Sequence, residues 1–331
     1  AKAGRGNPEW IIFMDPPRQA KLRGLISRAF GPKAIADLEP RISSLARQLL
    51  DRFPENGAMD LVTEYATPLP MMVIAELIGI PSAEWTRFRK WSDGILQLSQ
   101  TLSAGAAAQR AVMEYTAVKA ELSAYVTALI ESRRTDPRND LLTRLVEAGV
   151  DGERLTDGEV IGFIELLIVA GQETTSNLIS NAMICLTEFP DQRKALEQQP
   201  ALWQAAIEEV LRYRSPVQWV FRATTADVEM HGEDIPAGTL VLPVIGSANR
   251  DSRIFPDAER FDIARAPNPH IAFGHGIHFC LGAALARLEA RIALPLLLER
   301  LPGIRLASPD AWMPRDALHV HGPSSLPVVF A

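Results

Sequence analysis

Residues 273–282 read Phe273-Gly-His-Gly-Ile-His-Phe-Cys280-Leu-Gly282, and a predicted helix follows directly. Three glycines surround the cysteine, and glycine lets backbone N–H groups approach a sulfur or a ligand without obstruction by a Cβ atom. The partial positive charge at the start of a helix favours a thiolate over a thiol. We interpret the segment as a loop that presents the Cys280 thiolate for metal ligation or nucleophilic attack.

Three other interpretations of Cys280 stay open on the residues alone. A free cysteine is most often a small buried hydrophobe. Zinc is a second option, with His275, His278 and Cys280 as ligands, although no further Cys/His pair with zinc spacing lies nearby. A Cys–His hydrolase is a third, because its partner residues would be distant in sequence.

Composition excludes several classes of protein. The 331 residues include 34 Lys and Arg against 40 Asp and Glu, a net charge of −6 that argues against non-specific nucleic-acid binding. The two cysteines cannot form a disulfide framework, which indicates a reducing cytoplasm. The most apolar stretch, residues 160–171, contains Glu165 and is too short to span a membrane, so we expect no membrane anchor.

The hydrophobic pattern predicts a mainly α fold with a small β region. Thr156 and Glu159 form a capping-box pattern that opens the longest predicted helix, which ends near Phe189 before Pro190. Short β-like runs follow at 217–225, 228–231 and 239–245. The other predicted helices cover residues 16–30, 32–52, 63–78, 82–99, 105–133, 201–214 and 281–300.

The Cys280 segment resembles the haem-binding loop of the cytochrome P450 family, in its soluble bacterial branch. The matching positions are Phe273, Gly274, Gly276, His278, Cys280 and Gly282. The resemblance implies haem b as cofactor, with Cys280 as the proximal iron ligand whose electron donation favours O–O cleavage. It also implies the cytochrome P450 fold, one domain with haem between the long central helix and the cysteine loop.

Ala170-Gly-Gln-Glu173-Thr174-Thr175 lies inside the long predicted helix. Ala170 and Thr174 are four residues apart, so they share a face and leave room for a flat macrocycle. A Thr hydroxyl in a helix can also donate to a carbonyl of the preceding turn. The segment alone is typical of a solvated polar patch. It resembles the family's oxygen-binding helix, which implies that Glu173 and Thr174 deliver protons during dioxygen reduction.

Glu209 and Arg212 are three residues apart on a predicted helix, which alone indicates a surface ion pair of small value. The resemblance implies instead a buried structural triad, completed by Arg260 from the downstream segment 255–261.

Haem carries two propionates that need cationic or hydrogen-bonding partners. The resemblance points to Arg23, Arg222 and His278, although each arginine alone is typical of a solvated surface charge. Gln19 stands where the family commonly has His, and its amide can donate a hydrogen bond but carries no charge. We expect propionate binding in a weaker local field.

The pocket above the haem is predicted to be apolar. Leu166, Val169 and Ala170 share the face of Thr174, and the resemblance adds Gln218 and Val220. Such a lining indicates a small apolar substrate, while ordinary core packing explains Leu166 and Val169 equally well.

The residues contain no flavin fingerprint and no iron–sulfur cysteine set. The resemblance therefore implies electrons from a ferredoxin or flavodoxin with its reductase, docking on the cysteine side. Basic side chains there could complement an acidic partner, although they could equally be ordinary surface charges; they are Lys21, Arg28, Arg287 and Arg291.

The sequence thus predicts one haem domain, residues 1–331, acting as a thiolate-haem monooxygenase. Two alternatives are a peroxide-driven peroxygenase and a non-catalytic haem-binding remnant of the family. The resemblance covers nearly all of residues 8–331, and the family usually has several dozen residues ahead of this point. Without that N-terminal part of the fold, we expect a pocket open on one side.

Overall fold

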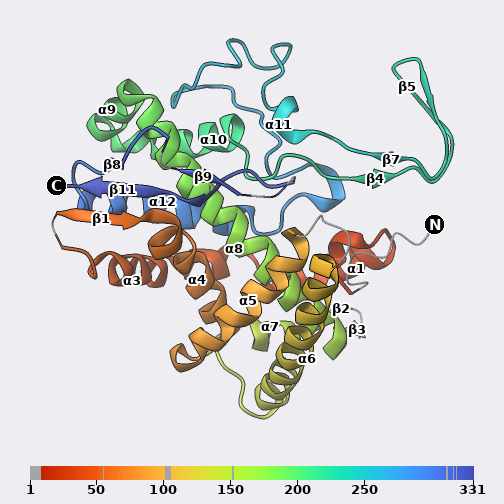
Figure 1. Cartoon of the computed structure of the whole chain (residues 1–331). Coiled ribbons are helices and arrows are strands. Elements are labelled where there is room, and N and C mark those ends of the chain that lie inside the picture. The colour runs from red at the N-terminus through yellow and green to blue at the C-terminus, as the bar shows by residue number, and fades with distance from the viewer. Residues whose placement is uncertain are drawn as a thin grey trace.

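Helices build most of the molecule, with small sheets at its edges (Figure 1). The computed structural model describes residues 9–54, 56–100, 106–150, 153–310, 312–315, 317 and 319–331. Residue 8, where the family resemblance begins, and residue 105, where a predicted helix begins, lie outside these ranges. The α-helices are α1 (Arg18–Ala29), α2 (Pro32–Ala36), α3 (Glu39–Leu50), α4 (Pro68–Ile78), α5 (Trp85–Gln100), α6 (Ala106–Thr135), α7 (Leu141–Glu147), α8 (Asp157–Glu188), α9 (Pro190–Gln198), α10 (Trp203–Tyr213), α11 (Ile245–Ala248) and α12 (Ala283–Arg300).

Helix α8 crosses the centre of the molecule and packs against α4, α5, α6, α7, α10 and α12 (Figure 1). Its start has the predicted capping box: the Glu159 backbone N–H donates to Thr156 Oγ1 (3.2 Å), and the Thr156 N–H donates to Glu159 Oε2 (2.8 Å). Both bonds satisfy N–H groups that a helix start would otherwise leave unpaired. The prediction of a long central helix is confirmed.

Prolines divide two of the predicted segments. The helix expected over residues 32–52 is two helices, because Pro40 lies in the first turn of α3 and cannot donate to a continuing α2. Pro190 ends α8 as predicted, but it also occupies the first position of α9, where its missing N–H costs nothing.

The largest sheet joins segments that are far apart in the sequence. Strand β1 (Gly57–Asp60) pairs antiparallel with β11 (Pro327–Phe330), which also pairs with β8 (Arg305–Leu306). The predicted late β region contains two smaller pairs, β4 (Arg222–Ala223) with β7 (Leu240–Val241), and β5 (Val228–Met230) with β6 (Glu233–Ile235). The remaining strand pairs are β2 (Gly149–Val150) with β3 (Glu153–Arg154), and β9 (Met313–Pro314) with β10 (Pro323–Ser325).

None of the helices within these described ranges has both the length and the apolar character that crossing a bilayer requires.

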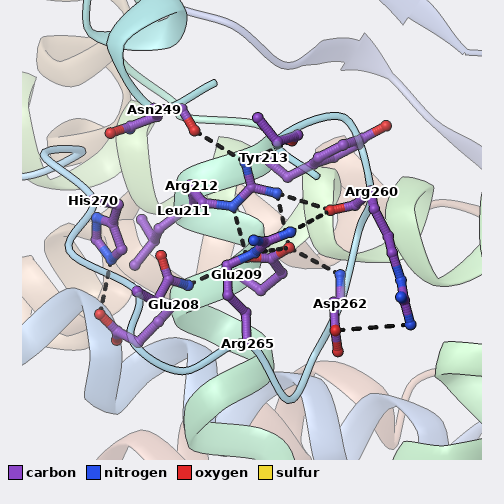
Figure 2. A network of polar contacts seen from close by, with 12 residues as sticks. Glu208, Glu209, Leu211, Arg212, Tyr213, Asn249, Arg260, Asp262, Arg265 and His270 are labelled. Atoms are coloured by element: carbon purple, nitrogen blue, oxygen red, sulfur yellow. Dashed lines mark hydrogen bonds and ion pairs between the residues drawn. The ribbon is translucent and has the colours of Figure 1, made fainter. Parts of the chain in front are cut away.

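A fully buried ion pair on α10 holds the segment that leads to the cysteine loop (Figure 2). Arg212 donates twice to Glu209, each bond 2.8 Å long, and both side chains are 0% exposed. The guanidinium also donates to the carbonyls of Asn249, Ala258 and Arg260. Burying a charge pair is favourable only when its remaining donors and acceptors are satisfied, and these bonds satisfy them.

The third member of this group is Arg265, so the prediction of Arg260 is wrong. Arg265 Nε lies 3.2 Å from Glu209 Oε1, and the Arg265 side chain is only 9% exposed. The Arg260 side chain is 65% exposed and reaches Asp262 at 3.8 Å, while only its backbone carbonyl enters the network (Figure 2). The loop turns between these two arginines, and no local pattern shows which of them faces inward.

Replacing Arg265 with Ala should leave the buried Glu209 carboxylate without its second charged partner. We expect the free energy of unfolding to fall by about 2–4 kcal/mol, because a lost charged hydrogen bond to a buried group is costly. Arg260→Ala is the matched control and should cost less than about 0.5 kcal/mol, as exposed side chains usually do. Urea unfolding of both variants measures the difference, and equal losses would contradict this assignment.

Candidate functional site

The cysteine loop is closed by its own backbone. The Cys280 N–H donates to the Phe273 carbonyl at 2.9 Å, across a short 3-10 turn, η5 (Gly276–His278). Gly274 and Gly276 both have left-handed backbone conformations, with φ of 72° and 75°, which other residues adopt with strain. A Cβ atom on Gly282 would lie 4.0 Å from the Cys280 sulfur. The loop therefore presents one sulfur at the start of α12.

The Cys280 thiol is exposed at the surface of this loop, yet the surrounding protein atoms partly desolvate the sulfur. Desolvation raises the pKa of the thiol, although the Gly282 N–H, Arg23 and Arg287 act in the opposite direction. A bound metal ion supplies the positive charge that deprotonates such a thiol.

Helix α1 holds the loop from one side. Gln19, which is 1% exposed, donates its amide N–H to the Ile277 carbonyl at 2.8 Å. Arg23 donates to the Phe279 carbonyl at 2.6 Å. The Gln19 amide, predicted to contact a propionate, is used here to fix the loop against α1.

Arg23 and Arg222 lie close enough to His278 for their charges to act on it. Burial lowers the pKa of His278, and the charges of Arg222 and Arg23 lower it further, while Asp15 opposes them. Arg222 lies on β4 and donates to the Phe221 carbonyl. Within the described part of the chain, no carboxylate forms an ion pair with Arg23 or Arg222. The cluster therefore offers positive charge to an anionic ligand beside Cys280.

The middle of α8 has an open face. Leu166, Val169 and Thr174 are partly exposed and Ala170 is exposed, whereas the residues on the other sides of this segment are mostly buried. The spacing of three, four and eight residues puts these four side chains in one stripe. Thr174 Oγ1 donates to the Ala170 carbonyl at 2.6 Å, a bond typical of a hydroxyl inside a helix.

Glu173 lies beside this stripe but, unlike the stripe residues, it is buried: its side chain is 4% exposed. Its Oε1 lies 3.6 Å from Nε of Arg315, which follows β9 near the C-terminus. Arg315 is not among the site residues predicted from the sequence. No motif surrounds it, and only the fold brings it to α8.

Gln218 and Val220 were predicted to line the pocket. The Gln218 amide donates to the Ser215 carbonyl at 2.7 Å and lies against Gly246, in a cavity of about 280 Å³ that Arg250 and His321 also line. Among the described contacts, none joins Gln218 to the α8 stripe. Val220 is partly buried and donates its N–H to the Pro243 carbonyl.

The donor set fits haem better than a bare metal ion. Within the described ranges, no group of three or more His, Cys, Asp or Glu side chains could hold a metal ion, so Cys280 is offered as a single protein ligand. A porphyrin supplies the other ligands itself. Its two carboxylates match the positive charge of Arg23 and Arg222, and the exposed Ala170 leaves room on α8 for a flat ring.

Comparison with known proteins gives the same family. The cytochrome P450 family model matches residues 2–302. Cytochrome P450 107B1 of Saccharopolyspora erythraea is 46% identical over 320 residues, which cover 96% of this chain and 76% of that protein. Vitamin D(3) 25-hydroxylase of Pseudonocardia autotrophica is 40% identical, with 96% and 77% covered.

Solved structures agree with the fold. The crystal structure of CYP109E1 from Bacillus megaterium in complex with testosterone superposes with a TM-score of 0.92 at 39% identity, covering 98% of this chain and 87% of that one. Family, relatives and fold all identify an oxygenase with a haem cofactor, a small-molecule substrate and an electron-transfer partner. The chain belongs to the cytochrome P450 family.

Proposed function

We propose that this chain is a haem-thiolate monooxygenase that inserts one oxygen atom from O2 into an apolar small organic molecule. The observation that carries the proposal is the fixed loop with a single thiol, Cys280, beside the positive charge of Arg23 and Arg222. The reducing cytoplasm inferred from the cysteine content, and a single haem domain, belong to the same proposal.

The residues at the loop would hold the cofactor in defined ways. Cys280 would ligate the iron, and Arg23, Arg222 and His278 would contact the propionates. Ala170, Phe273, Gly274 and Gly282 would border the ring. When bound, the haem supplies the activation of dioxygen, and the thiolate donates electron density that favours O–O cleavage.

Glu173 and Thr174 would manage protons. The Thr174 hydroxyl donates to a carbonyl of its own helix, which leaves its oxygen able to accept a hydrogen bond from water on the exposed stripe. The adjacent Glu173 carboxylate is buried against Arg315, which holds a proton-exchanging group beside the stripe while shielding it from bulk water.

Apolar side chains support the substrate class. Leu166 and Val169 line the stripe beside Thr174, and apolar pockets bind apolar ligands. The relatives point the same way, because one is named for vitamin D3 and a solved neighbour binds testosterone. We infer a lipophilic organic substrate.

A ferredoxin or flavodoxin with its reductase would supply the electrons. The basic side chains on the cysteine side already have partners: Lys21 pairs with Glu153, Arg287 with Glu208, and Arg291 with Glu39, while Arg28 donates to the Gly149 carbonyl. Arg291 is half exposed and its ion pair is long, at 3.6 Å, so we propose it as the residue most available to an acidic partner.

Replacing Cys280 with Ala should abolish the thiolate-type absorption spectrum of the ferrous carbon monoxide complex, because no sulfur would remain at the ligand position. Cys185→Ala is the control, since Cys185 is fully buried in α8 and should leave the spectrum unchanged. Absorption spectra of both haem-loaded variants test this. A thiolate-type spectrum in Cys280→Ala would refute the ligand assignment.

Replacing Thr174 with Ala should divert reducing equivalents from product to hydrogen peroxide, because proton delivery would lose its hydroxyl. Thr175→Ala is the matched control: Thr175 is the next residue but only 3% exposed, away from the stripe. The measurement is product and peroxide formed per NAD(P)H consumed in a ferredoxin–reductase system. Unchanged coupling in Thr174→Ala would contradict the proton relay.

The Thr174→Ala variant also distinguishes a monooxygenase from a peroxide-driven peroxygenase. Hydrogen peroxide alone already carries the protons and electrons that the relay would supply. Product formation with peroxide that equals or exceeds the reductase-driven rate, and that is unaffected by Thr174→Ala, would favour a peroxygenase.

A further inference from the structure

A second group of charged residues lies against the cysteine loop and has no part in the proposed chemistry. Glu208 on α10 accepts two hydrogen bonds of 2.7 Å from Arg287 on α12, and His270 Nε2 lies 2.9 Å from the same carboxylate. The His270 Nδ1 accepts the Ala272 backbone N–H at 3.2 Å, so Nε2 carries the proton and donates to Glu208. Glu208 therefore receives hydrogen bonds from two separate elements.

Glu208 stays ionised near neutral pH. Burial opposes its ionisation, but the hydrogen bonds from Arg287 and His270 outweigh this effect and lower the pKa of Glu208 to about 2. The pair therefore carries one negative and one positive charge, in a partly buried position where solvent screens it incompletely; the side chains of Glu208 and Arg287 are 24% and 37% exposed.

Arg287 links this pair to the sulfur. Its guanidinium carbon lies 4.4 Å from the centre of the Phe273 ring, a stacked cation–π distance. The Phe273 carbonyl accepts the Cys280 backbone N–H. The guanidinium of Arg287 is thereby held over the ring of the residue that binds the Cys280 backbone, and the Glu208 carboxylate is bonded to the same guanidinium.

We propose that Glu208 and Arg287 are positioning residues that set the reduction potential of the haem. Their bidentate pair fixes the guanidinium on the Phe273 ring, and their opposed charges determine the field at the Cys280 sulfur. The inference rests on the proposed ligation of iron by Cys280. Adding one electron to the ferric haem is favoured by positive charge nearby and disfavoured by negative charge.

The test is the midpoint potential of the one-electron ferric–ferrous couple, measured by spectroelectrochemical titration of the haem-loaded protein. Glu208→Gln leaves the Arg287 charge uncompensated and should shift the midpoint to more positive values, while its amide oxygen still accepts from His270. Arg287→Ala leaves the carboxylate uncompensated and should shift the midpoint to more negative values. The double variant removes both charges and should lie near the parent protein.

A matched control lies one helical turn further along α12. Arg291 pairs with Glu39 at 3.6 Å, and both side chains are at least half exposed. Glu39→Gln and Arg291→Ala make the same charge changes without contact to Phe273, so their midpoints should stay near the parent value. Arg287→Lys restores the charge and should recover most of the shift of Arg287→Ala.

Shifts of Glu208→Gln and Arg287→Ala in the same direction would overturn the inference, as would shifts no larger than those of the control pair. A midpoint for Arg287→Lys equal to that of Arg287→Ala would exclude a charge effect. The ferrous carbon monoxide spectrum of the parent protein is recorded first. Without a thiolate-type spectrum the proposed ligand fails, whereas with that spectrum and no opposed shifts only the role of Glu208 and Arg287 fails.

Discussion

The hydrogen bond from the Cys280 N–H to the Phe273 carbonyl closes the loop on which the whole site depends. A loop of this length would otherwise have many conformations, and fixing each residue costs conformational free energy. Here contacts with α1 and with α12 offset this free-energy cost. Gln19 and Arg23 bind loop carbonyls from α1, and Arg287 of α12 stacks on Phe273. The sulfur is thereby held in one place before any ligand binds.

Two neighbouring glutamates on α10 support this loop through different ion pairs. Glu209 turns into the core, where it joins Arg212 and Arg265 and fixes the chain that leads to the loop. Glu208 turns toward α12, where its pairing with Arg287 reaches the loop itself. The first pair is fully buried and its role is structural, because charges without solvent contact need every donor satisfied. The second pair lies against the loop and is only partly screened by solvent, so its charges can act on a nearby redox centre.

Local patterns predicted the parts of the molecule that depend on local physics. The Thr156 capping box, the extent of α8 and the Thr174 hydrogen bond to Ala170 follow from neighbours within four residues, and the structure contains all three. The glycines of the cysteine loop likewise indicate a backbone with positive φ angles, and Gly274 and Gly276 have them.

The features that sequence reasoning missed join distant segments. Strand β1 pairs with β11 across almost the whole chain, Arg315 reaches Glu173 from the C-terminal region, and Arg265 replaces Arg260 because of the path of a loop. Gln19 is similar, since its partner Ile277 lies on another element. Such contacts depend on how the helices and loops pack together, which the hydrophobic pattern of a single segment does not predict.

Every role proposed for the loop depends on a bond between the Cys280 sulfur and haem iron. X-ray absorption at the iron edge of the ferric, haem-loaded protein tests it directly, because sulfur scatters more strongly than nitrogen or oxygen in the first coordination shell. We expect one sulfur neighbour in the parent protein and none in Cys280→Ser. A first shell of only nitrogen and oxygen in the parent protein, or a sulfur neighbour that persists in Cys280→Ser, would contradict it.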